Sequence, residues 1–159
     1  MHKLSVAQRA YIAGFLDGDG SIYVRLKPNE TYRYKFQVAP SVVLYQHSSE
    51  RAFLEKLQKL MQIGYLRDRN DGITELTIGD RPSIRKLVKW TMPYLRLKVS
   101  QAELMLNILD KSEQVRSGND FYKVSKLIDQ FGRLNYSKRR VVNAQRVYRT
   151  LVERGLLTP

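Results

Sequence analysis

Two carboxylates, Asp17 and Asp19, alternate with Gly18 and Gly20 directly after a helix-like apolar segment. Paired carboxylates could serve acid–base chemistry, or their oxygens could ligate a hard divalent cation such as Mg²⁺. The chain has no cysteine and only two histidines, which excludes a thiolate metal site and leaves too few ligands for a histidine zinc site. Any metal at this position is therefore expected to be held by oxygen.

The segment that leads to these carboxylates is expected to be a helix that begins after Ser5. Residues 5–8 fit a capping box, in which the Ser5 side chain accepts from the Gln8 backbone and the Gln8 side chain reaches back. The glycines after the apolar segment supply a stop. Small residues at spacings of three and four are expected on one side, where another helix can approach: Ala10, Ala13 and Gly14. The simpler interpretation is an ordinary first helix followed by two solvated aspartates.

Length and composition favour one compact domain with a polyanionic partner. The chain has 159 residues, of which 43% are hydrophobic, enough for a sizeable core. Its 28 Lys and Arg against 15 Asp and Glu give a net charge of +13, which favours nucleic acid but does not separate DNA from RNA. Nothing resembles a membrane span or a signal peptide. We expect a soluble, intracellular protein with no membrane partner and no small-molecule substrate.

Four segments are expected to be strands that share one basic face. Residues 21–27 alternate cleanly, a longer extended segment covers about 32–46, and residues 65–69 and 73–78 flank a turn of the Asn-Asp-Gly type. The polar side chains predicted to contact nucleic acid are Ser21, Tyr23, Arg25, Lys27, Arg33, Lys35, Gln37, Arg67, Arg69, Glu75 and Thr77, with Asn29 and Tyr32 near the first connecting turn. The simpler interpretation is that several of these charges only solvate an exposed sheet face.

Amphipathic helices are expected at about residues 50–63, 81–90 and 101–110, followed by two more near 121–134 and 143–154. The resulting order is αββαββα with additional C-terminal helices, an α+β fold with a four-stranded antiparallel sheet. We expect a single domain over residues 1–159, with a core at about 5–110 and a C-terminal helical part at about 111–159.

A basic sheet face could lie in a DNA major groove or serve as a platform for single-stranded RNA. RNA platforms depend on exposed aromatic residues, whereas most of the side chains on this face are hydrogen-bonding groups suited to base edges. Duplex DNA is therefore favoured, although Tyr23, Tyr32 and Tyr45 keep the RNA alternative open.

The ten residues from Tyr11 to Gly20 resemble the LAGLIDADG signature of homing endonucleases. The element order and the segments 64–69, 93–98 and 134–138 look like the single-motif, homodimeric members encoded in algal chloroplast ribosomal RNA gene introns. The resemblance implies two signature helices packed at a dimer axis and a four-stranded saddle on each half of a pseudo-palindromic DNA site. The dimer-interface residues it implies are Ala10, Ala13, Gly14 and Asp17.

The same resemblance implies the residues of an active site. Asp19, Gln46 and Lys98 match catalytic positions, and Asp19 with the Gly18 carbonyl matches the metal site, while Asp17 is expected to have a capping or structural role. Mg²⁺ is the expected cofactor, with Mn²⁺ substituting and Ca²⁺ binding without supporting cleavage. A C-terminal basic cluster matches the family's contacts to the DNA backbone: Ser137, Lys138, Arg139 and Arg140.

One position departs from the family pattern. Glu50 stands where related enzymes usually carry a basic residue, and neighbouring Arg51 is one candidate to supply that charge. The expected function is site-specific double-strand DNA cleavage across the minor groove, which leaves short 3′ overhangs and promotes intron homing. The alternative is a catalytically silent RNA-splicing maturase or DNA-binding regulator, and a ribosome-associated basic protein ranks last. An organelle-encoded protein would act in the chloroplast or mitochondrion.

Overall fold

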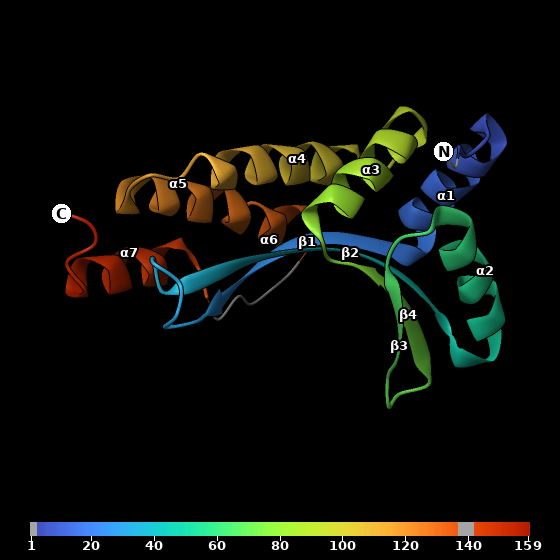
Figure 1. Cartoon of the computed structure of the whole chain (residues 1–159), viewed down its shortest axis with the longest axis horizontal. Coiled ribbons are helices and arrows are strands. Elements are labelled where there is room, and N and C mark those ends of the chain that lie inside the picture. The colour runs from blue at the N-terminus through green and yellow to red at the C-terminus, as the bar shows by residue number, and fades with distance from the viewer. Residues whose placement is uncertain (1–2, 137–141) are drawn as a thin grey trace. The chain divides into compact units, whose positions relative to one another are not determined.

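The computed structural model describes residues 3–136 and 142–159. Its elements follow the predicted αββαββα order and continue with further helices (Figure 1). They are α1 (Val6–Asp19), β1 (Gly20–Pro28), β2 (Phe36–His47), η1 (Ser48–Glu50), α2 (Arg51–Met61), β3 (Tyr65–Asp68), β4 (Ile73–Ile78), α3 (Arg81–Thr91), η2 (Met92–Tyr94), α4 (Val99–Glu113), α5 (Gly118–Asp129), α6 (Phe131–Leu134) and α7 (Ala144–Glu153). No helix within the described residues is long and apolar enough to cross a lipid bilayer.

The strands form one four-stranded sheet in the order β1-β2-β4-β3. β4 pairs antiparallel with both β2 and β3, and this register places Glu75 opposite Tyr45 on one side and Arg67 on the other. In β1, alternate residues are buried, as the two-residue period predicted: Ile22, Val24 and Leu26. The α+β fold class is confirmed.

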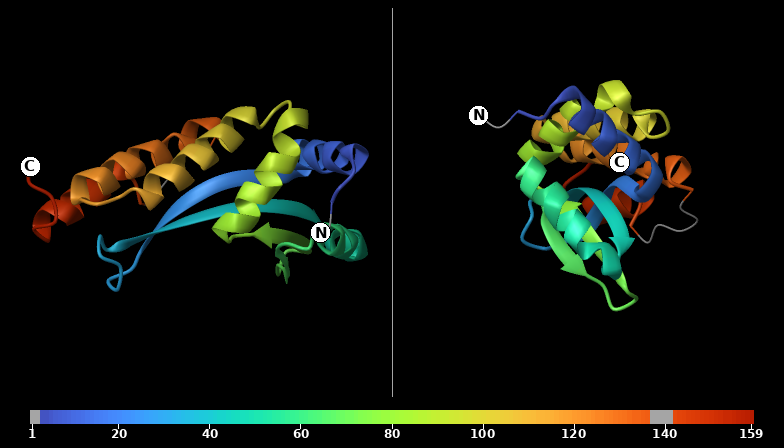
Figure 2. Two further views of the ribbon diagram at one scale, coloured as in Figure 1. Left: turned by 45° about the horizontal axis from the view of Figure 1, so that its top comes forward. Right: turned by 90° about the vertical axis from the view of Figure 1, so that its right-hand side faces the viewer.

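The chain divides into two compact units, and β1, β2 and α4 each contribute residues to both. The first unit contains the described residues up to Ile22 together with Ser41–Ala102. Within it, α3 packs against α1 (Figure 2), and α2 packs against β3 and β4 (Figure 1). Fully buried side chains from α1, β2, α2, β4 and α3 form its core: Ile12, Leu16, Leu44, Leu54, Leu76, Ile78, Ile84 and Leu87.

The second unit joins Tyr23–Pro40 to the described residues from Glu103 onward. α5 and α7 lie side by side in it (Figure 2). Tyr34 and Phe36 stack on Phe121 of α5, with ring centroids 5.4 and 6.5 Å apart. These aromatic contacts explain why residues 23–40 group with the C-terminal helices, whereas the sequence suggested a division near residue 110.

Two predicted elements were wrong in extent. The second strand begins at Phe36 and not at Tyr32, because residues 29–35 form a turn closed by a 2.8 Å bond from the Asn29 N–H to the Lys35 carbonyl. Lys35 has a φ of 67°, which is incompatible with a strand. The helix predicted over 121–134 is two helices, since the Gln130 N–H bonds to the carbonyl of Leu127, only three residues earlier.

Candidate active site

The local sequence of α1 places Asp19 at the last residue of the helix. The predicted capping box is confirmed, with Ser5 N–H to Gln8 Oε1 at 2.8 Å and Gln8 N–H to Ser5 Oγ at 3.2 Å. At the other end, a Cβ on Gly20 would lie 2.5 Å from Leu16 Cδ1 and 2.7 Å from the Leu16 carbonyl oxygen. Only glycine lets the chain pass directly from α1 into β1, and that sharp passage leaves the Asp19 side chain exposed.

Gln46, near the end of β2, is brought to Asp19 by the sheet. Its Nε2 amide donates to Asp19 Oδ2 at 3.1 Å, and its Oε1 accepts from the His47 N–H at 3.3 Å. The two contacts use both ends of the amide and so orient the Gln46 side chain toward the carboxylate. Two of the three predicted catalytic side chains therefore touch, although 27 residues separate them in the sequence.

Lys98 and Asp17 meet at the same end of α1. The Lys98 Nζ donates to the Asp17 backbone carbonyl at 2.7 Å, which puts its charge two residues before Asp19. The Asp17 carboxylate accepts from the backbone N–H groups of Arg96, Leu97 and Lys98 at 2.7, 3.2 and 3.0 Å. These bonds agree with the predicted capping role of Asp17, and its place at a dimer interface stays a prediction.

A Mg²⁺ ion needs several oxygen ligands, and one chain offers few of them at this place. Among the described residues, no group of three or more His, Asp or Glu side chains gathers into a metal site. Asp19 is exposed, and a Cβ on Gly18 would meet nothing within 4 Å, so the approach to the Gly18 backbone is open. One carboxylate plus one carbonyl fits a metal that is shared with a second copy of the chain and with phosphate oxygens.

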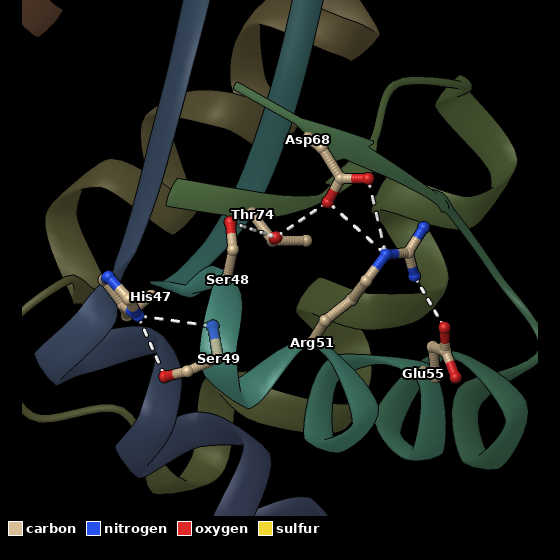
Figure 3. A network of polar contacts seen from close by, with 7 residues as sticks. All are labelled: His47, Ser48, Ser49, Arg51, Glu55, Asp68 and Thr74. Atoms are coloured by element: carbon tan, nitrogen blue, oxygen red, sulfur yellow. Dashed lines mark hydrogen bonds and ion pairs between the residues drawn. The ribbon is translucent and has the colours of Figure 1, made fainter. Parts of the chain in front are cut away.

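The Arg51 guanidinium is engaged by two acids of its own chain. Figure 3 shows the Arg51 side chain turned toward the β3–β4 hairpin and along α2. Its Nε lies 3.4 Å from Asp68 and its Nη1 lies 2.6 Å from Glu55. Arg51 therefore links α2 to the β3–β4 hairpin. These contacts do not support the hypothesis that Arg51 supplies the positive charge that is absent at position 50.

The same network continues through a fully buried threonine (Figure 3). The Thr74 hydroxyl lies 2.8 Å from Asp68 Oδ1 and 2.9 Å from Ser48 Oγ. Nearby, His47 Nδ1 accepts from the Ser49 N–H at 3.2 Å, so the His47 side chain caps η1. Sequence reasoning missed this network because its members are separated by up to 26 residues. It fixes the hairpin to the end of β2 that carries Gln46.

The β3–β4 hairpin carries four of the predicted contacts, Arg67, Arg69, Glu75 and Thr77. Arg67 and Arg69 both pair with Glu75, at 3.9 and 3.4 Å, and Arg69 also pairs with Asp71. The hydrogen bond to Asp71 is the main reason that the pKa of Arg69 is raised further above its ordinary value. The exposed fraction of the Glu75 side chain is only 13%, so this acid lies lower in the face than Arg67 and Arg69, which are 67% and 39% exposed. Strand pairing places Tyr65 beside Thr77 on this face, and the two-residue period of β2 adds His47 and Tyr45, of which Tyr45 was considered only as a stacking aromatic.

The remaining predicted contacts lie on β1, in the turn after it and at the start of β2, and all of them that the structure describes except Ser21 belong to the second unit. Arg25 and Lys27 are exposed, and the Arg25 guanidinium lies 4.8 Å from the centre of the Tyr23 ring. In the turn, Asn29 Oδ1 accepts from the Thr31 backbone at 3.0 Å. Tyr32 and Arg33 are exposed there, whereas Ser21, Lys35 and Gln37 are half-buried. Arg33 and Lys35 therefore project from a turn and not from a strand face, as a correction to the prediction. Ser137, Lys138, Arg139 and Arg140 lie outside the described residues.

The residues expected at a dimer interface differ in exposure. Ala13 is fully buried within its own chain, so its side chain is not available to a partner. Gly14 is exposed, and a Cβ there would meet nothing within 4 Å outside the helix's own backbone. Val6 and Tyr11, which are 66% and 56% exposed, lie on the same helix, and Ala10 is half-buried. The exposed surface near the middle of α1 is thus apolar, and at Gly14 it has no side chain.

Taken together, a mixed α+β core, a polar strand face and a carboxylate at the end of the first helix define a class of nucleic-acid-processing proteins. The chain belongs to the LAGLIDADG endonuclease family, whose model matches residues 12–98. It is 34% identical over 138 residues to DNA endonuclease I-CreI of Chlamydomonas reinhardtii, covering 86% of this chain and 84% of that protein. It is also 32% identical over 146 residues to DNA endonuclease I-CvuI of Chlorella vulgaris, covering 92% and 91%.

The structure agrees with these sequence relationships. It superimposes on a crystal structure of I-CvuI in complex with its target in the presence of 2 mM Ca with a TM-score of 0.91 at 31% identity, covering 96% of this chain and 98% of the other. A second I-CvuI structure, with the I-CreI target and 2 mM Mg and with the DNA not cleaved, gives a TM-score of 0.90. The fold expected from the signature is confirmed.

Proposed function

We propose that this protein is a homing endonuclease that cleaves both strands of a specific duplex DNA target. The observation that carries the proposal is the assembly at the end of α1, where Gln46 touches Asp19 and the Lys98 ammonium binds the backbone carbonyl of Asp17. Family membership, and relatives named as DNA endonucleases whose structures contain DNA targets, support the same conclusion.

The working form is proposed to be a homodimer on a pseudo-palindromic site. A single chain brings one Asp19 carboxylate, whereas cutting two strands requires two sites of chemistry. The exposed Gly14 on α1 allows a second α1 backbone to approach closely, which would bring the two Asp19 residues together. The polar residues of the β3–β4 hairpin and of β1 would then read base edges in each half of the site.

The chemistry is proposed to depend on a divalent cation held by Asp19 and the Gly18 carbonyl. When bound, the cation would offset the repulsion of two nearby carboxylates and stabilise charge on the leaving 3′ oxygen of the scissile phosphate. The chain's own residues have separate tasks. Gln46 holds the Asp19 carboxylate in place. Lys98, whose ammonium binds the Asp17 carbonyl, would present its positive charge to the scissile phosphate. Mg²⁺ is the proposed cation, with Mn²⁺ able to substitute and Ca²⁺ supporting binding only.

The proposal is tested with a randomised duplex library, cut in Mg²⁺ by the wild-type protein and by the Asp19→Asn variant, with binding measured in Ca²⁺. We expect cuts across the minor groove with short 3′ overhangs at one pseudo-palindromic site, lost in the variant while specific binding persists. Wild-type protein that binds one site but does not cut in Mg²⁺ or Mn²⁺ would contradict the nuclease proposal.

A second candidate is a catalytically silent maturase or DNA-binding regulator. Glu50 favours it, because position 50 carries an acid and Arg51 is committed to Asp68 and Glu55. Binding to the host intron RNA, measured beside the DNA library, distinguishes the two. Splicing stimulation without DNA cleavage would put this candidate first.

A further inference from the structure

Asp17 and Lys98 each extend a charged side chain to the end of the helix beside the other residue. Asp17 lies in the last turn of α1, where the helix dipole disfavours a carboxylate, and Lys98 directly precedes α4, where the dipole disfavours an ammonium. Each side chain instead reaches the end of the other helix. The carboxylate meets the N–H groups before α4, and the ammonium meets a carbonyl in the last turn of α1. Both contacts therefore have the favourable sign.

Asp17 binds Lys98 at two points, the backbone N–H and the side-chain ammonium. Its backbone N–H is bound by Asp17 Oδ1 at 3.0 Å, and its Nζ is bound by the Asp17 carbonyl at 2.7 Å. Its own carbonyl accepts from the Ala102 N–H at 3.0 Å and so begins α4. A lysine side chain ordinarily samples many rotamers, because its stem is long and flexible. Here both ends of the residue are fixed relative to the end of α1.

We propose that Asp17 is a positioning residue for the reaction and that it acts through Lys98. Because the Asp17 carboxylate accepts hydrogen bonds from the N–H groups of residues 96–98, it fixes the position of the Lys98 ammonium relative to Asp19. This inference rests on the proposed nuclease function, since it assigns Asp17 a task in that same site. It differs from a purely structural cap in predicting that the effect of Asp17 depends on the presence of the Lys98 ammonium.

A double-mutant cycle tests this dependence with the full-length wild type, Asp17→Asn, Lys98→Met and the double variant. Single-turnover cleavage is measured in Mg²⁺, and the Kd for the same DNA in Ca²⁺. We expect Asp17→Asn to slow cleavage about tenfold or more, with a Kd within about twofold of wild type. In the Lys98→Met background, Asp17→Asn should slow cleavage no further.

Asp120→Asn is the matched control. The Asp120 carboxylate also accepts a backbone N–H, from Arg116 at 2.9 Å, but it belongs to the second unit, whereas Asp17, Asp19 and Lys98 belong to the first. It should lower the unfolding temperature without slowing cleavage at a temperature where the protein is folded. If Asp17→Asn slows cleavage by the same factor with and without Lys98, or weakens DNA binding as much as it slows cleavage, the positioning role is wrong.

Amide hydrogen exchange in the protein without DNA gives a readout that does not require activity. Exchange at residues 96–98 should accelerate in Asp17→Asn and stay slow in Lys98→Met, because the carboxylate and not the ammonium holds these N–H groups. Unchanged exchange in Asp17→Asn would overturn the inference even if cleavage falls. A wild-type protein that cuts no target would instead contradict the proposed function itself.

Discussion

The Gln46 amide donates to the Asp19 carboxylate across 3.1 Å, which joins the end of β2 to the end of α1. Because the other end of the amide is bound by the His47 N–H, Gln46 can hold only one orientation without losing a bond. Gln46 therefore fixes a carboxylate that would otherwise rotate freely in solvent.

Replacing Gln46 by leucine should slow cleavage by about 10- to 100-fold, because Asp19 loses the group that orients it. DNA binding in Ca²⁺ should change little. Gln58→Leu is the control, since Gln58 also donates a hydrogen bond, to the Gly64 carbonyl at 2.8 Å, but serves only the fold. Single-turnover rates of the two variants decide the matter, and equal losses would contradict an orienting role for Gln46.

Arg51→Met should leave the cleavage rate within about twofold of wild type, because this guanidinium is engaged by Asp68 and Glu55. Both ion pairs are partly exposed, so the free energy of unfolding should fall by no more than about 1 kcal/mol. Urea unfolding and cleavage assays measure the two effects. A large loss of cleavage with unchanged stability would restore Arg51 as a phosphate contact.

Glu75→Gln should release Arg67 and Arg69 from their shared acid on the hairpin. DNA binding should become tighter and more dependent on salt, and base preference at the contacted positions should relax. Glu55→Gln removes the same charge from α2 and should leave base preference unchanged. Binding titrations over a series of salt concentrations, with a set of single base-pair changes, compare the two. Unchanged specificity in Glu75→Gln would show that Glu75 does not restrain the arginines.

Gly14→Ala separates an exposed helix face from a helix–helix interface. On an exposed face, alanine in place of a helical glycine should raise the free energy of unfolding by up to about 1 kcal/mol. In a close α1–α1 contact, the added methyl group should instead weaken the dimer at least about tenfold. We expect the second result, measured by analytical ultracentrifugation over a concentration series. Gly79→Ala, which also meets nothing within 4 Å but lies outside α1, should leave association unchanged.

Lowering the pH should destabilise the N-terminus of α3, because the Asp80 carboxylate caps this helix. Hydrogen bonds from the Ser83 side chain and backbone hold the pKa of Asp80 below its ordinary value of 3.8, against a smaller opposing effect of burial. A carboxylate whose pKa is lower in the folded state stabilises the protein fully above the ordinary value, and this stabilisation is lost as the pH falls through the lower, folded pKa. At pH 7, Asp80→Ala should lose about 0.5–2 kcal/mol of unfolding free energy. Chemical unfolding from pH 7 to pH 2 should show the difference from wild type shrink, and a constant difference would contradict the assignment.

Local patterns in the sequence were sufficient for most of the core. The Ser5–Gln8 capping box and the alternation of Ile22, Val24 and Leu26 depend only on residues within one turn or one strand, and the structure has both. The first connecting turn was predicted, but its extension to residue 35 was missed because Tyr34 and Phe36 suit a strand by type. Their place is decided by stacking on Phe121, which is distant in the sequence.

The candidate site could be predicted as a set of positions but not as a set of contacts. Asp17 bonds to N–H groups about 80 residues away, and no spacing rule indicates such a partner. The partners of Arg51 illustrate the same limit. Glu55 lies one helical turn away and is expected from helix geometry, whereas Asp68 becomes a neighbour only when the hairpin packs beside α2.

The close approach of Gly118 to the chain end limits how the protein can be trimmed or fused. A Cβ at Gly118 would lie 2.0 Å from the Leu156 carbonyl oxygen, so the backbone at residue 156 rests directly on the start of α5. A deletion that removes Leu156 would strip the covering from a buried glycine and from the first turn of α5. A linker that joins two copies into a single chain should therefore leave residues 156 and 157 intact and start beyond them.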